Sequence, residues 1–353
     1  MMRLFVAGLA VLVVASVASG APKSSGSLAL VTRGPVLAMA ADGNRAALLV
    51  AVKKRWRIVV WEPRRRRATP IATLTDPGCS RYCGPGGGLA LAGTRVAWEE
   101  AGAGNTLDTV VSSATLARRR TVSLGAGNWD FSFSGSGDEA LAPVGDGKLL
   151  AFTVQVHCAD PDSGGDPTCP AGREAGDVIA ASVWRVARSG RCPSYGDYRP
   201  FGHCARVAKV SGQLTVLAVD AGRIAARTDH GVRLLTATGG LLHDFPVENV
   251  RGAALSGNRL ALRVGGGVSV YDTSSGEVVF REEGGTRLEA LQSGILVTTV
   301  GKTVKLRRLE DGRVATIWTR GVPRAQLERP GLFVAAERRV TFTPMADVLR
   351  RLG

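Results

Sequence analysis

The sequence predicts an all-β fold, a β-propeller of seven four-stranded blades closed by the N-terminal strand. Three observations lead to this prediction: one unit recurs along most of the chain, its segments alternate apolar and polar residues as half-buried strands do, and no window has the pattern of a long helix. Repeats of about 20 to 50 residues built from short strands are typical of propellers.

The clearest units occupy the C-terminal half of the chain. Each begins with a tight turn, and the turn glycines Gly222, Gly257, Gly294 and Gly331 lie 35, 37 and 37 residues apart. In one unit the segments RLALRV, VSVYDT and EVVFRE are rich in β-branched residues and are separated by clusters of Gly, Asn, Asp and Ser. This pattern is typical of consecutive antiparallel strands, so each unit supplies the strands of one blade.

The same unit recurs in the N-terminal half with interruptions. Its turn glycines are Gly43, Gly93 and Gly147, at spacings of 50 and 54 residues and then 75 before the next unit. The excess falls in a loop near residue 80, in the segment 127–139 and in a disulfide-rich insertion at about 157–205. Seven units result. One misassigned unit would give six or eight blades, and a stacked β-solenoid is the alternative, although solenoid repeats are usually shorter.

The two ends of the chain predict how the ring closes. The last unit, residues 323–353, lacks a clear fourth strand, whereas SGSLALVTRG at 25–34 is a strand without a unit. Adding this strand to the last unit completes the blade and leaves no open sheet edge. We therefore expect a single propeller domain over residues 27–353.

Two segments carry a resemblance to known proteins. VYDTSSGEVVF, with Tyr271, Asp272 and Gly276, and LRRLEDGRVATIW, with Trp318, resemble the repeats of secreted WD40-like and quinoprotein-like propellers. Phe280 departs from the second pattern, because quinoprotein repeats usually have Trp there. The resemblance implies the propeller fold over nearly the whole chain after the leader, and it implies no particular activity.

Residues 1–20 have the layout of a secretory signal peptide. Arg3 is followed by an apolar run from Leu4 to Ala18 and then by small residues that suit cleavage after Gly20. An uncleaved membrane anchor is the alternative, because the run nearly reaches the roughly 20 apolar residues that a membrane span needs. No later segment is apolar for long enough, so we expect a soluble monomer that is secreted or periplasmic.

Six cysteines in an exported chain favour disulfide bonds. Their order predicts that neighbours pair, each pair closing a loop rich in Gly and Pro. The expected pairs are Cys79 with Cys83, Cys158 with Cys169, and Cys192 with Cys204. The alternative is a zinc site that takes its ligands from these cysteines and the adjacent histidines, but the tight Cys-x-x-Cys pairs usual in such sites are absent.

The formal charge of +15 comes from 45 Lys and Arg against 30 Asp and Glu, and only seven of the basic residues are Lys. The runs Arg64 to Arg67 and Arg118 to Arg120 adjoin predicted hairpin turns and are not interleaved with aromatic residues. Solvated surface charge is their simplest interpretation. We expect no nucleic-acid partner, because export separates the chain from nucleic acid, whereas an extracellular protein or an anionic envelope polymer remains a candidate partner.

The sequence contains no recognisable catalytic constellation. Nucleophilic hydrolysis would need a motif such as Gly-x-Ser-x-Gly with His and acidic partners, and no Ser fits. Quinone-dependent oxidation would need calcium ligands and stacking aromatics that cannot be assembled here. The run Gly265 to Gly267 lies between two predicted strands and predicts a hairpin turn. We therefore expect no enzymatic activity and no cofactor.

One acidic loop is a weak calcium candidate. Asp160, Asp162 and Asp166 place carboxylates around a glycine turn, as calcium loops do. The full 12-residue calcium pattern with its terminal Glu is missing, and Pro161 and Pro167 favour a plain surface loop. Otherwise the sequence predicts no metal site.

Propeller topology predicts one candidate binding face. If strands a to d run outward from the axis, the b-to-c turns and the d-to-a connections emerge together, and two of the three disulfide loops fall among them. The candidate residues on this face are Lys53, Lys54, Arg55, Trp129, Asp130, His230, Arg251, Arg287 and Arg324.

Two functions remain open. We expect a non-catalytic extracellular binding or scaffold propeller; the alternative is a lyase, hydrolase or quinoprotein-like oxidoreductase with its site at the channel mouth. Clustered Asp, His and Arg in the channel would favour the enzyme.

Overall fold

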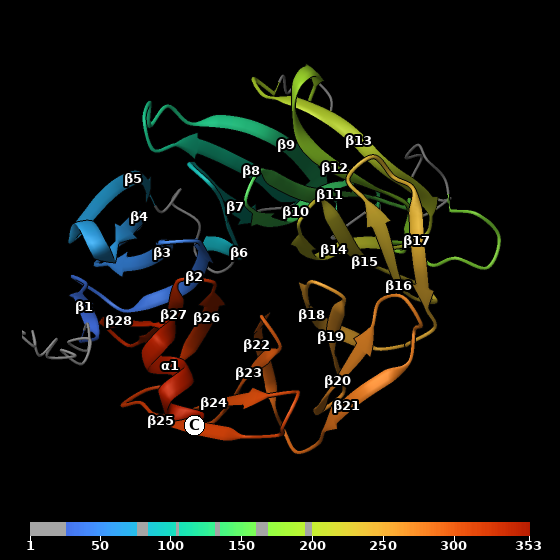
Figure 1. Cartoon of the computed structure of the whole chain (residues 1–353). Helices are drawn as coiled ribbons and strands as arrows, with labels where there is room; N and C mark the ends of the chain where they lie inside the picture. Colours follow the sequence, from blue (N-terminus) through green and yellow to red (C-terminus); the bar gives the residue numbers. More distant parts are fainter. Residues whose placement is uncertain (1–25, 76–83, 104–105, 131–134, 160–168, 195–199) are drawn as a thin grey trace, which may run out of the picture.

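The computed structural model describes residues 26–75, 84–103, 106–130, 135–159, 169–194 and 200–353. These residues form a ring of antiparallel sheets around a central axis (Figure 1). The prediction of an all-β propeller is confirmed. Among the described residues, no helix is long and apolar enough to cross a membrane.

Each blade is a meander whose strands run outward from the axis, and we letter them a to d from the innermost strand. Blades 1 to 3 consist of β2 (Val36–Asp42), β3 (Arg45–Val52), β4 (Arg55–Glu62) and β5 (Arg67–Thr75); β6 (Gly84–Ala92), β7 (Arg95–Ala103), β8 (Leu107–Thr115) and β9 (Val122–Trp129); and β10 (Gly137–Asp146), β11 (Leu149–His157), β12 (Val178–Arg191) and β13 (His203–Ser211). A short 3-10 helix, η1 (Pro63–Arg65), joins β4 to β5.

Blades 4 to 6 follow the same order with shorter strands. They consist of β14 (Leu214–Asp220), β15 (Arg223–Thr228), β16 (Gly231–Thr236) and β17 (Leu241–Phe245); β18 (Val250–Ser256), β19 (Arg259–Val264), β20 (Gly267–Asp272) and β21 (Val278–Glu282); and β22 (Arg287–Gln292), β23 (Ile295–Val300), β24 (Thr303–Arg308) and β25 (Val314–Trp318). As predicted, Gly265 to Gly267 form the turn between β19 and β20.

The last sheet joins the two ends of the chain. It consists of β26 (Arg324–Glu328), β27 (Gly331–Ala336), β28 (Arg339–Pro344) and β1 (Leu28–Val31), and β1 pairs antiparallel with β28. The short helix α1 (Met345–Arg351) follows β28, an element that the sequence pattern does not predict. Its Val348 packs into the core between blades 6 and 7.

The sheets number five of four strands and one of eight. The eight-stranded sheet contains two meanders, β6 to β9 and β10 to β13, joined only where Trp129 pairs with Gly137. Dividing the sheet at that single pair gives seven four-stranded units. The count of seven blades rests on this division.

The core lies between neighbouring blades, because both faces of each sheet are covered. Strands b and c supply most of it: β19 and β23 are buried along three and five consecutive residues. Trp98 of blade 2, for example, packs with Ile58 and Val60 of blade 1. Such continuous apolar runs are expected where a strand is buried on both faces.

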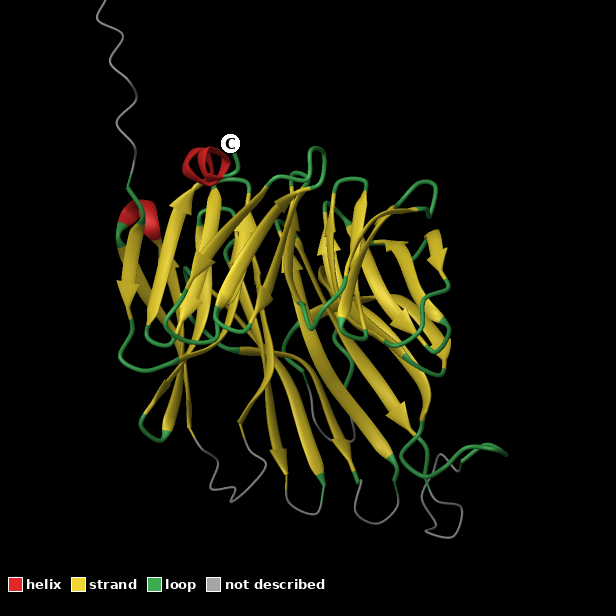
Figure 2. Cartoon of the chain, turned by 90° about the horizontal axis from the view of Figure 1, so that it is seen from below, coloured by secondary structure: helices red, strands yellow, loops and turns green. Residues whose placement is uncertain are grey.

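The turns divide the propeller into two faces. The a–b face carries the a-to-b and c-to-d turns together with α1, and the b–c face carries the b-to-c turns and the d-to-a connections (Figure 2). Six of the seven predicted turn glycines lie in a-to-b turns. The exception is Gly331, which opens β27, so that the turn itself is made by Arg329 and Pro330.

Two of the three predicted disulfides are present. Cys158 pairs with Cys169 in the β11–β12 connection on the b–c face, and Cys192 pairs with Cys204 between β12 and β13. Because all four sulfurs are bonded in pairs, the zinc alternative is excluded for these cysteines. Cys79 and Cys83 lie outside the described residues.

Candidate functional site

Three candidate residues form one exposed cationic turn on the b–c face. Lys53 and Lys54 make the β3–β4 turn, and Arg55 opens β4; all three side chains are exposed. Lys53 has a positive φ of 55°, so the turn projects its side chains outward from a tight bend. The β1–β2 connection packs beside this blade, where the Ala51 amide donates to the Pro35 carbonyl at 3.0 Å.

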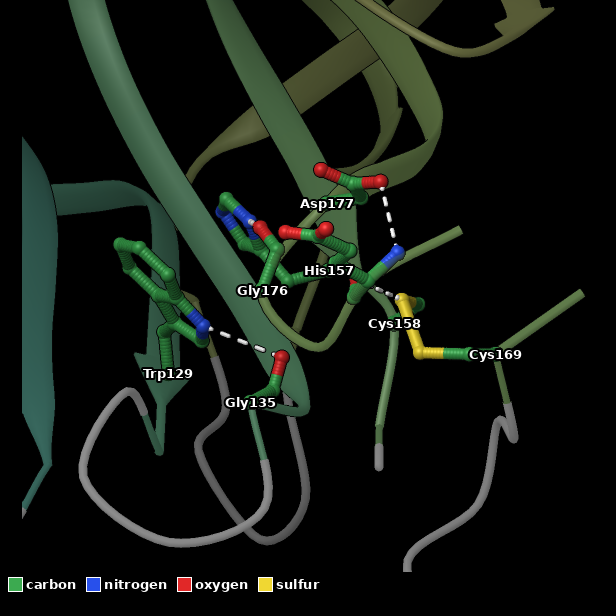
Figure 3. The surroundings of a disulfide bond; sticks show 8 residues. Trp129, Gly135, His157, Cys158, Cys169, Gly176 and Asp177 are labelled. Carbon is green, nitrogen blue, oxygen red and sulfur yellow. Dashed lines mark hydrogen bonds between the residues drawn. A yellow bond between two sulfur atoms is a disulfide. The ribbon is translucent and has the colours of Figure 1, made fainter. Parts of the chain in front are cut away.

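Trp129 is tied to the disulfide-bonded insertion of blade 3. It lies at the end of β9, and its indole stacks on His157 with ring centroids 4.0 Å apart (Figure 3). The indole Nε1 donates to the Gly135 carbonyl at 3.2 Å. His157 precedes Cys158 and is 4% exposed, with Nδ1 2.9 Å from the Gly176 carbonyl oxygen. Trp129 therefore has a structural role in holding this connection, and Asp130 follows it in the same loop.

Two carboxylates, Glu139 and Asp138, lie close to His157. Its Nε2 lies 3.3 Å from Oε2 of Glu139. Burial raises the pKa of nearby Asp138, and burial with Glu139 raises the pKa of Glu99 to about 7. The Ala142 amide donates to Glu99 at 3.0 Å, and its lowering effect is already included in the pKa of about 7.

Arg287 and Arg324 lie together on neighbouring innermost strands. Both face Glu289: Arg287 forms an ion pair with it, and burial lowers the pKa of Arg324, with Arg287 adding to the effect and Glu289 opposing it. Glu289 also accepts from the Ala325 amide at 2.9 Å, which joins blades 6 and 7. His230, in the β15–β16 turn, and Arg251, near the start of β18, are exposed on the same face but are not brought into this group.

A groove that the sequence reasoning missed lies on the outer side of blades 6 and 7. It has a volume of about 510 Å³, and its lining includes Val31, Trp318, Arg320, Arg338 and Arg339; we call it the Trp318 groove. Trp318 is 79% exposed and Val31 is 73% exposed. Trp318 stands at the end of a strand with alternating burial, so its outward direction could have been read from the period-2 pattern.

The central channel ends in a ring of polar side chains on the a–b face. All seven innermost strands line the channel, a cavity of about 200 Å³. Four of these strands end in a carboxylate, namely Asp42, Asp146, Asp220 and Glu328. We call these four residues the carboxylate ring. An acidic residue just before the a-to-b turn in four units was the sequence signal for it.

Each member of the carboxylate ring binds the next blade. Glu328 accepts from the Gly43 amide at 3.2 Å, and Asp42 accepts from the Gly93 amide. Asp146 and Asp220 accept in the same way from the a-to-b turns of blades 4 and 5, each at 3.1 Å. These bonds connect the tight turns around the axis.

Burial and mutual repulsion raise the pKa values of two carboxyl groups in the carboxylate ring. Burial, together with the negative charges of Asp42, Asp146 and Asp220, raises the pKa of Glu328 to about 8 against the lowering effect of the Gly43 amide. Burial also raises the pKa of Asp146. Ligand-capable oxygens of Asp42, Asp146 and Glu328 lie within 4.8 Å of one another, close enough to share one cation. The calcium candidates Asp160, Asp162 and Asp166 lie outside the described residues.

No protein-family model and no curated protein sequence matches the chain. Solved structures do match it. The chain is similar to a crystal structure of the mitotic checkpoint complex, with a TM-score of 0.53 and 13% identity over 90% of this chain and 94% of that chain. It is also similar to the β-propeller domain of Cps50 (Swd1) from Myceliophteria thermophila, with a TM-score of 0.50 and 9% identity over 90% of this chain and 98% of that chain. These structures are WD40 β-propellers, so the predicted WD40-like resemblance is confirmed at the level of fold.

Proposed function

We propose that this WD40-like propeller is a non-catalytic binding module that acts outside the cytoplasm and holds a protein partner on its b–c face. The observation that carries the proposal is the Trp318 groove, where exposed apolar side chains stand among unburied arginines. Aromatic residues and Arg are enriched where proteins bind one another. A partner with an acidic rim and an apolar centre would complement this surface.

The cationic surface continues beyond the groove. Arg338 adjoins the β1–β2 connection, because its carbonyl accepts from the Thr32 amide at 2.8 Å, and that connection packs beside the Lys53 to Arg55 turn. Val322, in the connection after Trp318, adds a further apolar side chain that is 67% exposed. Blades 6, 7 and 1 together therefore offer one extended docking surface.

Two features support an extracellular setting. The predicted signal peptide would export the chain, and the bonds Cys158–Cys169 and Cys192–Cys204 are of the kind that persists in oxidising compartments. WD40 neighbours in structure are typically scaffolds rather than enzymes, which supports a binding role.

The proposal is tested by site-specific photo-crosslinking of the exported protein. A cross-linking side chain at position 318 should capture a discrete surface protein, and the variant Trp318→Ala should lose that partner in a pull-down. The control is Leu241→Ala in β17, an exposed residue at the a–b end of blade 4. Equal capture by both variants, or no discrete partner from position 318, would contradict the proposal.

The carboxylate ring favours a second candidate, a propeller enzyme with its site at the channel mouth. Raised carboxyl pKa values in a cavity are typical of catalytic sites. Against this, each ring carboxylate already accepts a backbone hydrogen bond, and each of the four histidines lies on a strand or turn outside the channel lining. A saturable thermal shift with calcium or a quinone cofactor, removed by Glu328→Gln, would support the enzyme.

A further inference from the structure

We propose that the a–b face of blades 1 to 3 binds a linear acidic polysaccharide along an arc of arginines. The setting outside the cytoplasm rests on the proposed function. The surface does not, because it lies on blades 1 to 3, whereas the Trp318 groove lies on blades 6 and 7.

Three hollows follow one another along the periphery of this face. The first hollow, of about 380 Å³, is lined by blades 1 and 2. The second, of about 420 Å³, is lined by blades 2 and 3. The third, of about 520 Å³, is also lined by blades 2 and 3 but lies nearer their a-to-b turns. The second and third share Arg95, Val186 and Ala187, and the β8–β9 turn lines both the first and the second. The hollows therefore form one continuous arc.

Cations dominate the lining of all three hollows. We call the following set the basic arc: Arg45, Arg65, Arg67, Arg95, Arg118, Arg119, Arg120, Lys148, Arg185 and Arg188. The described lining residues include one carboxylate, Glu62, which pairs with Arg45 at 2.8 Å and lies 3.7 Å from Arg65. Within the described part of the chain, the other members form no salt bridge.

The cations without a salt bridge produce a positive electrostatic potential, which favours an anionic ligand over a neutral one. Arg118, Lys148 and Arg188 are exposed, whereas the guanidinium of Arg95 is partly buried and donates to Ser113 at 3.4 Å. Burial lowers the pKa of Arg95, and an anion in the hollow would relieve that cost. Guanidinium groups bind carboxylates in a bidentate manner, which suits a chain that carries one carboxylate per sugar.

An aromatic ring stands at the mouth of the second hollow. Phe201 is 76% exposed beside Arg118, Arg120 and His203. An exposed aromatic ring offers its face to the C–H groups of a sugar ring, while the adjacent guanidinium groups bind the carboxylate. This combination favours an acidic sugar over a simple inorganic polyanion.

The second disulfide holds Phe201 in this position. Cys192 and Cys204 close the loop, and the Gly202 amide donates to the Ser123 carbonyl of β9 at 3.1 Å. A Cβ on Gly202 would lie 2.9 Å from the Leu124 side chain and 3.0 Å from the Cys192 sulfur, so the backbone can approach blade 2 only as glycine. The backbone next to Phe201 is thus fixed to blade 2.

Other anionic partners fit less well. A single strand of nucleic acid needs successive aromatic platforms for its bases. Phe201 and His203 are the ring-bearing side chains among the described lining residues of the arc. A flat lipid surface would not enter recessed hollows. We therefore assign the arc to a flexible acidic glycan.

The test is a binding titration of the mature protein with polygalacturonate oligomers, at low and at physiological salt. The arc variant is R118Q/R120Q/R188Q, and the charge-matched control is R173Q/R281Q/R329Q, whose arginines are exposed and lie outside the arc. The arc variant should bind about 10-fold more weakly and the control less than about 3-fold more weakly. Wild-type affinity should fall as salt rises, and methyl-esterified oligomers should not bind.

Three results would overturn the proposal: equal weakening by both triple variants, equal binding of the esterified oligomer, or tighter binding of single-stranded DNA of equal charge. Thermal unfolding of each variant checks that it is folded. Phe201→Ala should weaken binding to polygalacturonate more than to inorganic polyphosphate, and equal weakening would contradict the sugar assignment. Trp318→Ala should leave polygalacturonate binding unchanged, which separates this proposal from the protein-binding function.

Discussion

Blades 4 to 6 and blades 1 to 3 share one architecture but differ in how often their basic side chains form ion pairs with carboxylates. In blades 4 to 6 several basic side chains pair with a carboxylate. Four pairs lie within one blade, namely Arg223–Asp220, Arg233–Asp244, Arg259–Asp272 and Arg308–Asp311, and Lys305 of blade 6 pairs with Glu282 of blade 5. In blades 1 to 3, Glu62 is the one carboxylate among the described residues that line the basic arc. The repeat therefore specifies the fold without specifying the surface.

Strand length separates the same two regions. Strands of blades 2 and 3 have between 8 and 14 residues, as in β9 and β12, whereas those of blades 4 to 6 have between 5 and 7, as in β17 and β14. The longer strands carry the insertions and both described disulfides. Irregular blades on a regular ring provide distinct surfaces, because a rigid scaffold fixes loops that vary freely.

The largest effect is expected from substitutions in the core, which test whether the cores of the two regions are equally well packed. Leu150 of β11 and Leu260 of β19 are equivalent b-strand residues, 2% and 0% exposed. Substituting either with Ala should lower the free energy of unfolding by about 3 kcal/mol, because each leaves a cavity. Chemical denaturation measures both. A cost below about 1 kcal/mol for Leu150→Ala alone would show that the irregular blades are loosely packed.

Removing the second disulfide should rank next. Cys192 and Cys204 are 12 residues apart, and opening a loop of that length costs about 3 kcal/mol in the chain-entropy model. We expect C192S/C204S to destabilise the protein by that amount or less and to weaken polygalacturonate binding through release of Phe201. If the folded double variant bound polygalacturonate as tightly as wild type, the disulfide would not be needed for the binding site.

The carboxylate ring predicts an unusual pH dependence. The pKa of Glu328 is raised to about 8 in the folded state, well above its ordinary value, so the folded protein keeps a proton that the unfolded chain releases. Stability should therefore fall as the pH rises from about 5 to about 8. Glu328→Gln retains the acceptor for the Gly43 amide and should be about 2 kcal/mol more stable than wild type at pH 9, and equal to it at pH 5. Thermal melts measured across this pH range would contradict the prediction if the difference in melting temperature between the two proteins did not change with pH.

The smallest effect is expected from removing a carboxylate in blade 6, which would leave its arginines without an ion pair, as most arginines of the basic arc are. Asp311 pairs with Arg308 at 3.1 Å and with Arg313 at 3.4 Å near the surface. Asp311→Asn should cost less than about 1 kcal/mol, since exposed ion pairs contribute little. It should also raise nonspecific binding to a polyanion column slightly, measured as the salt concentration needed for elution. Unchanged elution would show that freed arginines alone do not make a polyanion surface.

Local pattern was sufficient to predict the repeat, the strand order and the pairing of β1 with the last blade. Turn glycines and alternating strands are local signals, and six of the seven glycines lie in the expected turns. Helix α1 was missed because MADVLRR is too short to show a helical period, and its stability comes from packing of Val348 against blades 6 and 7.

The surfaces were predicted less well than the fold. Arg287 and Arg324 were predicted only to share the candidate binding face, and neither their position on adjacent strands nor their shared partner Glu289 was foreseen. The carboxylate ring and the basic arc were both missed because each joins residues from several blades, and the distance between repeats in space is not contained in any one repeat. The arginine runs at 64–67 and 118–120 were interpreted singly as solvated charge, whereas the structure aligns them along one arc.

The pairing of β1 with β28 also constrains the order of assembly. Leu28 lies opposite Phe342, so a strand made at the start of synthesis finds its partner only after more than 300 residues have followed. The closing step is thus the contact with the longest sequence separation, which is expected to form late. Until that contact forms, the edge of β28 stays open, and a chain truncated before residue 339 would remain an unclosed arc. Closure of the ring therefore depends on synthesis having passed β28.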